Sequence, residues 1–293
     1  MTDATLTTVN GQPTLRFERR LAHRPAKVWR AVTDPAEMKH WFPAAVEAEL
    51  RPGAPMRFTF PEEAPVEADW DGEVLEVDEP KVFMFRWAGD VLRIELTPDD
   101  DGCRLVFTQT IGGGDVGILG AGRTAAGWDT CLDQLTAQLD GTSLAENEDW
   151  LTPVAHYVEK FGIGAGSVTS TEDGWRLHFA RDLMWKPPAD VWPEVLKLAD
   201  HPSPTDSPLE YDWHHDGERA GTVRWELHSD PKLGERVEVT QTVPTHLADL
   251  RAQLLAARHA QLETLFATVM GDPEPLPEDR VAELTKQYEA RLA

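Results

Sequence analysis

The chain has 293 residues, enough for one large domain or two ordinary ones, and its 41% hydrophobic residues and 11 tryptophans can fill a packed interior. It carries 51 acidic residues against 28 basic ones, a formal net charge of −23, and no block of basic residues interrupts this balance. A field of this sign repels phosphate backbones and anionic lipids. The composition therefore argues against nucleic acid and against a membrane as partners.

Neither a secretion signal nor a membrane span is expected. The N-terminal residues lack both the basic and the apolar segment of a signal peptide, and no apolar run approaches the ~20 residues that span a bilayer. The two cysteines, Cys103 and Cys131, lie outside any Cys–X–X–Cys or Cys/His ligand spacing. We expect a cytoplasmic protein with reduced thiols, no metal site and no cofactor.

The first half of the chain follows an α+β pattern. Residues 15–21 alternate apolar and charged positions, as a half-buried strand does. Pro25 suits the first turn of a short helix, and Asp34-Pro35 suits the start of a second one that runs to Phe42. Successive strands joined by tight turns pair antiparallel, so we expect one curved antiparallel sheet. Its further strands are expected at 56–60, 68–77, 82–87, 91–96 and 103–111.

A helix over residues 127–141 follows these strands, with Gly141 as a left-handed stop. Its apolar positions recur at steps of three and four, which places them on one face that must pack on the sheet. Asp129 and Asp133 lie on or toward the other side. The apolar face consists of Ala125, Trp128, Leu132, Leu135 and Leu139.

A domain boundary is expected after a second helical pattern, residues 150–161, because a glycine-rich, polar stretch follows it. We expect a full domain at 1–162, a linker at 163–174 and a shortened domain at 175–293. The second helix, and a C-terminal helix with Tyr288 on its apolar stripe, are expected to dock on their own domains.

The second domain repeats the first. Residues 177–183 match 15–21 at an offset of 162, whereas 223–227 match 92–96 at an offset of 131. The leucines and the glycine of the long helix recur around residues 262–271, without a tryptophan at the place of Trp128. The fall in offset means that the second copy lacks the second short helix and the first strands of the sheet.

The first copy resembles the activator of heat-shock-protein-90 ATPase homologue-like family, within the START-like (SRPBCC, helix-grip) superfamily. The resemblance rests on residues 25–29, 32–35, 41–42, 72–80 and 127–128 with Leu132 and Leu135. It implies a seven-stranded antiparallel sheet gripping the long helix, usually around an apolar cavity, with the first strand paired to the last. The fold class is thus α+β, with two helix-grip domains. Members of the superfamily bind lipids, hormones and polyketides, some catalyse cyclisation, and one branch stimulates the chaperone ATPase.

Aromatic residues gather where such a cavity would lie. They either line a pocket or simply fill the core, as aromatic stripes usually do. The candidates are Trp41, Phe42, Phe58, Phe60, Trp70, Phe83, Phe85, Trp87 and Trp128.

Arg19 and Gln109 are polar residues on otherwise apolar strand faces, and Arg181 and Gln241 repeat them in the second copy. A buried guanidinium needs acceptors. Either Arg19 pairs with an acidic neighbour near the sheet edge, or Arg19 and Gln109 orient a polar ligand group.

No catalytic residue is assigned. Residues 112–117 match GxGxxG, but a meander sheet precedes them, so we expect a loop rather than a nucleotide site. His259 is expected to be a core histidine with a partner. Three functions remain open: a domain that binds a small hydrophobic or amphipathic ligand, beside a degenerate second copy; a chaperone-regulating or other protein-interaction module; and a polyketide cyclase-like enzyme, with a non-enzyme favoured.

Overall fold

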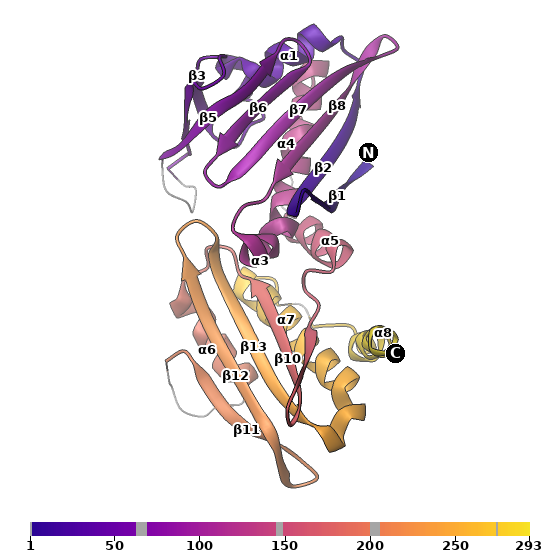
Figure 1. Cartoon of the computed structure of the whole chain (residues 1–293). Helices are drawn as coiled ribbons and strands as arrows, with labels where there is room; N and C mark the ends of the chain where they lie inside the picture. The colour runs from indigo at the N-terminus through magenta and orange to yellow at the C-terminus, as the bar shows by residue number, and fades with distance from the viewer. Residues whose placement is uncertain (1, 63–68, 145–148, 200–205, 274) are drawn as a thin grey trace. The chain divides into compact units, whose positions relative to one another are not determined.

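The computed structural model describes residues 2–62, 69–144, 149–199, 206–273 and 275–293. The chain forms two compact units, Met1–Ile163 and Gly164–Ala293. Each unit places an antiparallel sheet against a long helix (Figure 1), which confirms the predicted α+β class.

Unit 1 contains one antiparallel sheet in the order β1-β2-β8-β7-β6-β5-β4-β3. The first predicted strand pairs with the last, with Leu15 opposite Gln109. The sheet has eight strands where the resemblance implied seven, because β1 adds an edge that its polar, threonine-rich sequence did not indicate. The strands are β1 (Thr2–Val9), β2 (Gln12–Leu21), β3 (Ala45–Ala48), β4 (Pro55–Thr59), β5 (Asp69–Asp78), β6 (Val82–Trp87), β7 (Asp90–Asp99) and β8 (Gly102–Thr110). The predicted start of β5 at Ala68 lies outside the described residues.

The long helix α4 (Ala121–Asp140) ends at Gly141, whose φ of 69° confirms the predicted left-handed stop. All five residues of its predicted apolar stripe are buried. The helix begins at Ala121 rather than Gly127, where no side chain caps it to mark the start. The added turn contains Gly122, where a Cβ atom would lie 2.6 Å from Val158 Cγ2 on α5. A glycine is therefore needed for α4 and α5 to approach so closely.

The other helices of unit 1 are α1 (Pro25–Thr33), α2 (Pro35–Met38), α3 (Gly114–Gly117), the 3₁₀ turn η1 (Ile118–Gly120) and α5 (Leu151–Phe161). The predicted helix-starting residue Asp34 accepts a hydrogen bond from the Ala36 backbone N–H at 2.9 Å. The GxGxxG stretch forms the β8–α3 loop and α3, beside an antiparallel sheet. It therefore has no parallel βαβ context.

Unit 2 has a five-stranded sheet in the order β11-β12-β13-β10-β9. The order matches β6-β7-β8-β2-β1 of unit 1, and the described residues of unit 2 hold no counterpart of β3, β4 or β5. This arrangement is compatible with a shortened second copy. Its elements are β9 (Ser167–Thr171), β10 (Gly174–Asp182), α6 (Pro188–Leu198), β11 (Leu209–His215), β12 (Glu218–Asp230), β13 (Gly234–Pro244), η2 (Thr245–Leu250), α7 (Arg251–Met270) and α8 (Arg280–Leu292).

Part of the stretch expected to be a linker is the strand β9, which pairs with β10. The Gly166 backbone N–H donates to the hydroxyl of Tyr288 at 2.8 Å, and a Cβ atom on Gly166 would lie 2.3 Å from the Phe179 ring. These contacts tie the start of unit 2 to its own core.

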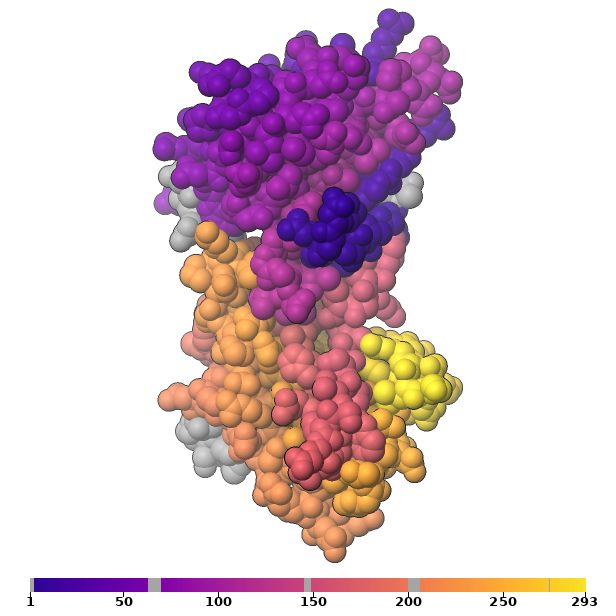
Figure 2. Space-filling model, viewed as in Figure 1, coloured from indigo at the N-terminus to yellow at the C-terminus, as the bar shows by residue number. Residues whose placement is uncertain are grey.

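The outermost elements of each unit are visible on its surface. In Figure 2 the indigo N-terminal segment covers part of unit 1, and the yellow helix α8 projects from unit 2. Within the described part of the chain, no helix is long and apolar enough to cross a membrane.

Candidate functional site

Nine aromatic side chains of unit 1, all predicted from the sequence, form one connected set of ring contacts that we call the aromatic cluster. They are Trp41, Phe42, Phe58, Phe60, Trp70, Phe83, Phe85, Trp87 and Trp128. Phe42 lies at the centre, with ring centroids 5.6 Å from Trp128 and 5.2 Å from Trp87. The sequence pattern therefore identified side chains that do meet beneath α4.

The aromatic cluster is deeply buried at one end and half-buried at the other. Phe58 and Phe85 are 0% exposed, whereas Phe60, Trp70 and Trp87 are only partly covered. These three rings contact one another, with centroids 5.5–6.0 Å apart, and the rings of Phe60 and Trp87 are stacked. The accessible aromatic surface of the cluster therefore lies at the ends of β4 and β6 and the start of β5.

Trp87 differs from its neighbours in its indole N–H. The Trp41 indole donates to the backbone carbonyl of Ala31 at 2.9 Å, and the Trp128 indole donates to Gln109 Oε1. The Trp87 N–H is buried and has no hydrogen-bond partner among the described residues. A buried donor of this kind favours any group that brings an acceptor.

A polar chain runs along one side of the aromatic cluster. Gln109 accepts from Trp128 through Oε1 and donates through Nε2 to the carboxylate of Asp90, which also accepts from the Gly112 backbone N–H at 2.7 Å. Burial raises the pKa of the Asp90 carboxyl, while the two hydrogen bonds oppose that shift. Asp90 was not among the predicted site residues, because Gly89-Asp90 was interpreted only as a turn.

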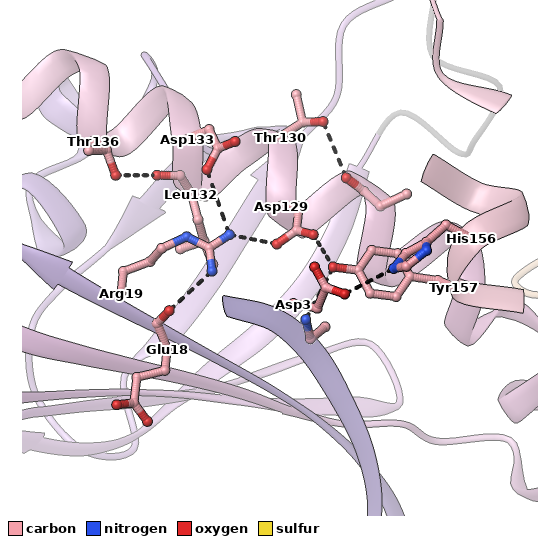
Figure 3. Close-up of polar contacts among 12 residues, drawn as sticks. Asp3, Glu18, Arg19, Asp129, Thr130, Leu132, Asp133, Thr136, His156 and Tyr157 are labelled. Carbon is pink, nitrogen blue, oxygen red and sulfur yellow. Dashed lines mark hydrogen bonds and ion pairs between the residues drawn. The ribbon is translucent and has the colours of Figure 1, made fainter. Parts of the chain in front are cut away.

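Arg19 belongs to a second polar group, shown in Figure 3. Its Nη2 lies 2.6 Å from Asp129 Oδ1 and 3.6 Å from Asp133, and its Nη1 donates to the backbone carbonyl of Glu18 at 3.1 Å. The predicted ion pair is therefore present, but its carboxylates come from α4 rather than from the sheet edge. The sequence pattern had placed both acids on or toward the outer side of that helix.

Asp129 links this group to α5 and β1. It accepts from the hydroxyl of Tyr157, and the same hydroxyl accepts from the Ala4 backbone N–H at 3.1 Å. Burial, together with the neighbouring carboxylate of Asp129, raises the pKa of Tyr157. The tyrosine therefore stays a neutral donor that joins α5 to α4 and β1, and Asp129 extends the link to Arg19 on β2.

Arg19 and Gln109 do not converge on one point. Arg19 stands opposite Leu105, and Gln109 stands opposite Leu15, so four register positions separate them along the β2–β8 ladder. At about 3.4 Å per residue this is roughly 13 Å. Each side chain also has partners within the protein.

Unit 2 repeats the arginine and the glutamine of these positions as Arg181 and Gln241, but with other partners. Arg258 Nε donates to Gln241 Oε1 at 2.9 Å, as Trp128 does to Gln109. His259 Nδ1 lies 2.9 Å from the Tyr288 hydroxyl, and burial lowers the pKa of His259 to about 4. His259 is therefore a core histidine with a partner, as predicted. The Arg181 guanidinium lies 4.3 Å from the centre of the Phe266 ring.

Both cysteines are free, and burial raises the pKa of Cys103 to about 11 and that of Cys131 to about 12. At neutral pH both are protonated thiols, which are poor nucleophiles and poor metal ligands.

Comparison with known proteins matches part of the chain to a family. Residues 22–140 match the model of the family described as activator of Hsp90 ATPase homolog 1-like protein. This stretch runs from the end of β2 to the end of α4 and is less than half of the chain. No curated protein matches the chain.

Several solved structures are similar to this chain. A conserved protein of unknown function, EF2215 from Enterococcus faecalis, is 22% identical with a TM-score of 0.47, over 54% of this chain and 90% of that chain. CalU16 from Micromonospora echinospora is 17% identical with a TM-score of 0.41, over 54% and 93%. MLL2253 from Mesorhizobium loti is 26% identical with a TM-score of 0.40, over 45% and 99%. The resemblance inferred from the sequence is confirmed for residues 22–140, which match the activator of Hsp90 ATPase homolog 1-like family.

Proposed function

We propose that unit 1 binds a small apolar or amphipathic ligand at the half-buried end of the aromatic cluster. Phe60, Trp70 and Trp87 supply aromatic surface there, and burial of a ligand against it is favourable at about 25 cal/mol per Å² of apolar area. The deeper rings support these three, and Gln109 holds Trp128 in place. Arg19 anchors α4 through Asp129, so its influence on the ligand is indirect.

The buried Trp87 N–H without a partner is the observation that carries the proposal. Leaving such a group unpaired costs about 1–3 kcal/mol, which an acceptor on the ligand would recover. Trp213 stands at the matching register position of unit 2, since it lies opposite Gly221 as Trp87 lies opposite Asp90. Its indole N–H donates to the Thr242 carbonyl at 2.9 Å. Of these two matching tryptophans, Trp87 is therefore the one with an unused donor within the described residues.

A matched pair of probes tests this proposal on the full chain. 2-Acetylnaphthalene carries a carbonyl acceptor, whereas 2-ethylnaphthalene has a similar shape without one. We expect the ketone to bind about tenfold more tightly, because one recovered hydrogen bond is worth about 1.4 kcal/mol. Trp87→Phe should remove that preference, and Trp213→Phe should leave it unchanged.

Tryptophan fluorescence titration and native mass spectrometry would measure the two affinities. Failure of both naphthalenes to bind would refute an apolar site at this end of the cluster. Equal affinities in the unsubstituted protein would refute the role of the Trp87 donor.

The alternative is a chaperone ATPase activator-like or other protein-interaction module without a ligand. The close contacts among the deep rings favour it, since those rings fill the space beneath α4 with one another. A direct measurement of Hsp90 ATPase turnover with and without the protein separates the two functions. Stimulation that survives Trp87→Phe would support the module.

A polyketide cyclase-like enzyme is the third function, and Asp90 is the acid that it would use, because burial raises the pKa of its carboxyl group. For any of the three functions we expect the protein to act in the cytoplasm, where its two thiols would stay reduced.

A further inference from the structure

The interior of unit 2 holds two side chains with unused hydrogen-bond donors. Gln241 lies on β13 opposite Val223, and Trp225 lies on β12 opposite Val239. Opposed residues share a face of a sheet, so Gln241 and Trp225 are diagonal neighbours on the face that α7 covers, with Cβ atoms roughly 7–8 Å apart. Both are almost wholly buried, with exposures of 1% and 0%.

Neither donor has a partner among the described residues. The Nε2 atom of Gln241 and the Nε1 atom of Trp225 are buried and make no hydrogen bond within the part of the chain that the structure describes. The amide orientation of Gln241 is determined by Arg258, whose Nε donates to Oε1 at 2.9 Å. Reversing the amide would place two donors against each other, so Nε2 is the group left without an acceptor.

The matching glutamine of unit 1 shows which acceptor Gln241 lacks. There Gln109 Nε2 donates to the carboxylate of Asp90. The register counterpart of Asp90 is Gly221, because Asp90 stands two positions before Leu92, which pairs with Gln109, and Gly221 stands two positions before Val223, which pairs with Gln241. A Cβ atom on Gly221 would lie 2.5 Å from the Thr242 carbonyl oxygen, so a side chain cannot fit there without a shift of the backbone. Unit 2 therefore has the amide donor, Gln241, but within the described residues no carboxylate at the position of Asp90 to accept from it.

The charge beside this pair is positive. Arg258 replaces Trp128 as the donor to the glutamine, and its Nη1 donates to Gln261 Oε1 at 2.6 Å. Within the described residues it makes no ion pair with an acid. Two buried N–H donors therefore lie on the same face of the sheet. The Arg258 guanidinium, which is hydrogen-bonded to Gln241, has no carboxylate partner within the described residues, in a chain whose net charge is −23.

We propose that unit 2 binds a small carboxylate ligand at Gln241, Trp225 and Arg258. The carboxylate oxygens accept from Gln241 Nε2 and Trp225 Nε1, and Arg258 balances the charge. The ligand supplies the kind of acceptor that Asp90 supplies in unit 1. The site is separate from the proposed function of unit 1, where the ligand offers an uncharged acceptor to Trp87.

The indole resonance of Trp225 in a proton–nitrogen correlation spectrum is a direct probe of the full chain. Its loss in Trp225→Phe identifies it. We expect sodium acetate to shift this resonance downfield to saturation, because a carboxylate acceptor deshields the indole proton. Sodium chloride should not shift it, and the Trp213 indole, already bonded to Thr242, should not respond to acetate.

Three variants keep the test decisive. Gln241→Leu should abolish the acetate shift, whereas Gln253→Leu, the same change at an exposed position of α7, should leave it intact. Gln241→Glu supplies a carboxylate within the site, so it should raise the thermal midpoint and also abolish the acetate shift.

Three results would each overturn the proposal. They are a Trp225 resonance that ignores acetate, one that moves equally with chloride, and an acetate shift that survives Gln241→Leu. The first would mean that buried water alone satisfies the two donors.

Discussion

Acidification should destabilise unit 2 through His259. Burial keeps the imidazole neutral and lowers its pKa from 6.5 to about 4. Three arginines, Arg181 on β10 with Arg280 and Arg291 on α8, add to that shift, while Glu263 on α7 opposes it. In the neutral ring Nδ1 accepts from the Tyr288 hydroxyl, which in turn accepts from a backbone N–H of unit 2.

The direction of the effect follows from proton uptake. In the unfolded chain His259 binds a proton near pH 6.5, whereas in the folded chain it resists protonation until about pH 4. The unfolded state therefore holds more protons between these values, and stability falls as the pH falls. The pKa falls by about 2.5 on folding, and at about 1.4 kcal/mol for each unit the full loss is about 3.5 kcal/mol, of which about 3 kcal/mol has occurred by pH 4.

Urea denaturation of the full chain between pH 7.5 and pH 4, followed by hydrogen exchange at α7 and α8, would measure this loss. His259→Asn removes the titrating group, so its stability should fall by about 3 kcal/mol less over the same range. His246→Asn, at an exposed histidine of unit 2, should follow the unsubstituted protein. Parallel pH profiles for the unsubstituted protein and His259→Asn would refute the reasoning.

Three further predictions concern the polar and glycine positions of the two units. Gly122→Ala should destabilise unit 1 by about 1–3 kcal/mol in urea because its Cβ would meet α5, whereas Gly127→Ala, with no atom within 4 Å, should stabilise it by about 0.5–1 kcal/mol. Gln109→Glu should lower the thermal midpoint, because the new carboxylate would face that of Asp90, whereas Gln241→Glu should raise it, because the new carboxylate would face Arg258. Changes of the thermal midpoint in the same direction for both variants would contradict this assignment of acceptors. Arg19→Met should cost about 2 kcal/mol in urea, and a loss well below 1 kcal/mol would show that the ion pair contributes nothing.

Local patterns of apolar and polar residues predicted much of the fold. The apolar stripe of α4 and the alternation along β2 depend on neighbours within a few residues, and both appear as expected. The shortened sheet of unit 2 is likewise compatible with the jump in repeat offset. β1 could not be predicted in this way, because of its residues with a described side chain only Ala4 is buried, and its pairing is decided by the free edge of β2.

The partners of the buried polar side chains could not be predicted from the sequence, for a different reason. Asp129 lies on the side of α4 that the pattern marks as outer, yet it meets Arg19, 110 positions earlier, and Tyr157 on another helix. Such pairings depend on how β2, α4 and α5 pack together, which periodicity does not encode. The aromatic cluster was predictable as a set, whereas the unused donor of Trp87 became visible only with its surroundings in place.

The bond between the Ala4 backbone and the Tyr157 hydroxyl joins residues 153 positions apart, and Gly166 and Tyr288 are joined in the same way across 122 positions. On the ribosome, the edge strand of each unit is made first and its anchoring tyrosine last. The hydrogen bond between the edge strand and the tyrosine therefore cannot form until nearly the whole unit has been synthesised. Because such long loops close late, we expect docking of the final helix to be the step that completes each unit, first unit 1 and then unit 2.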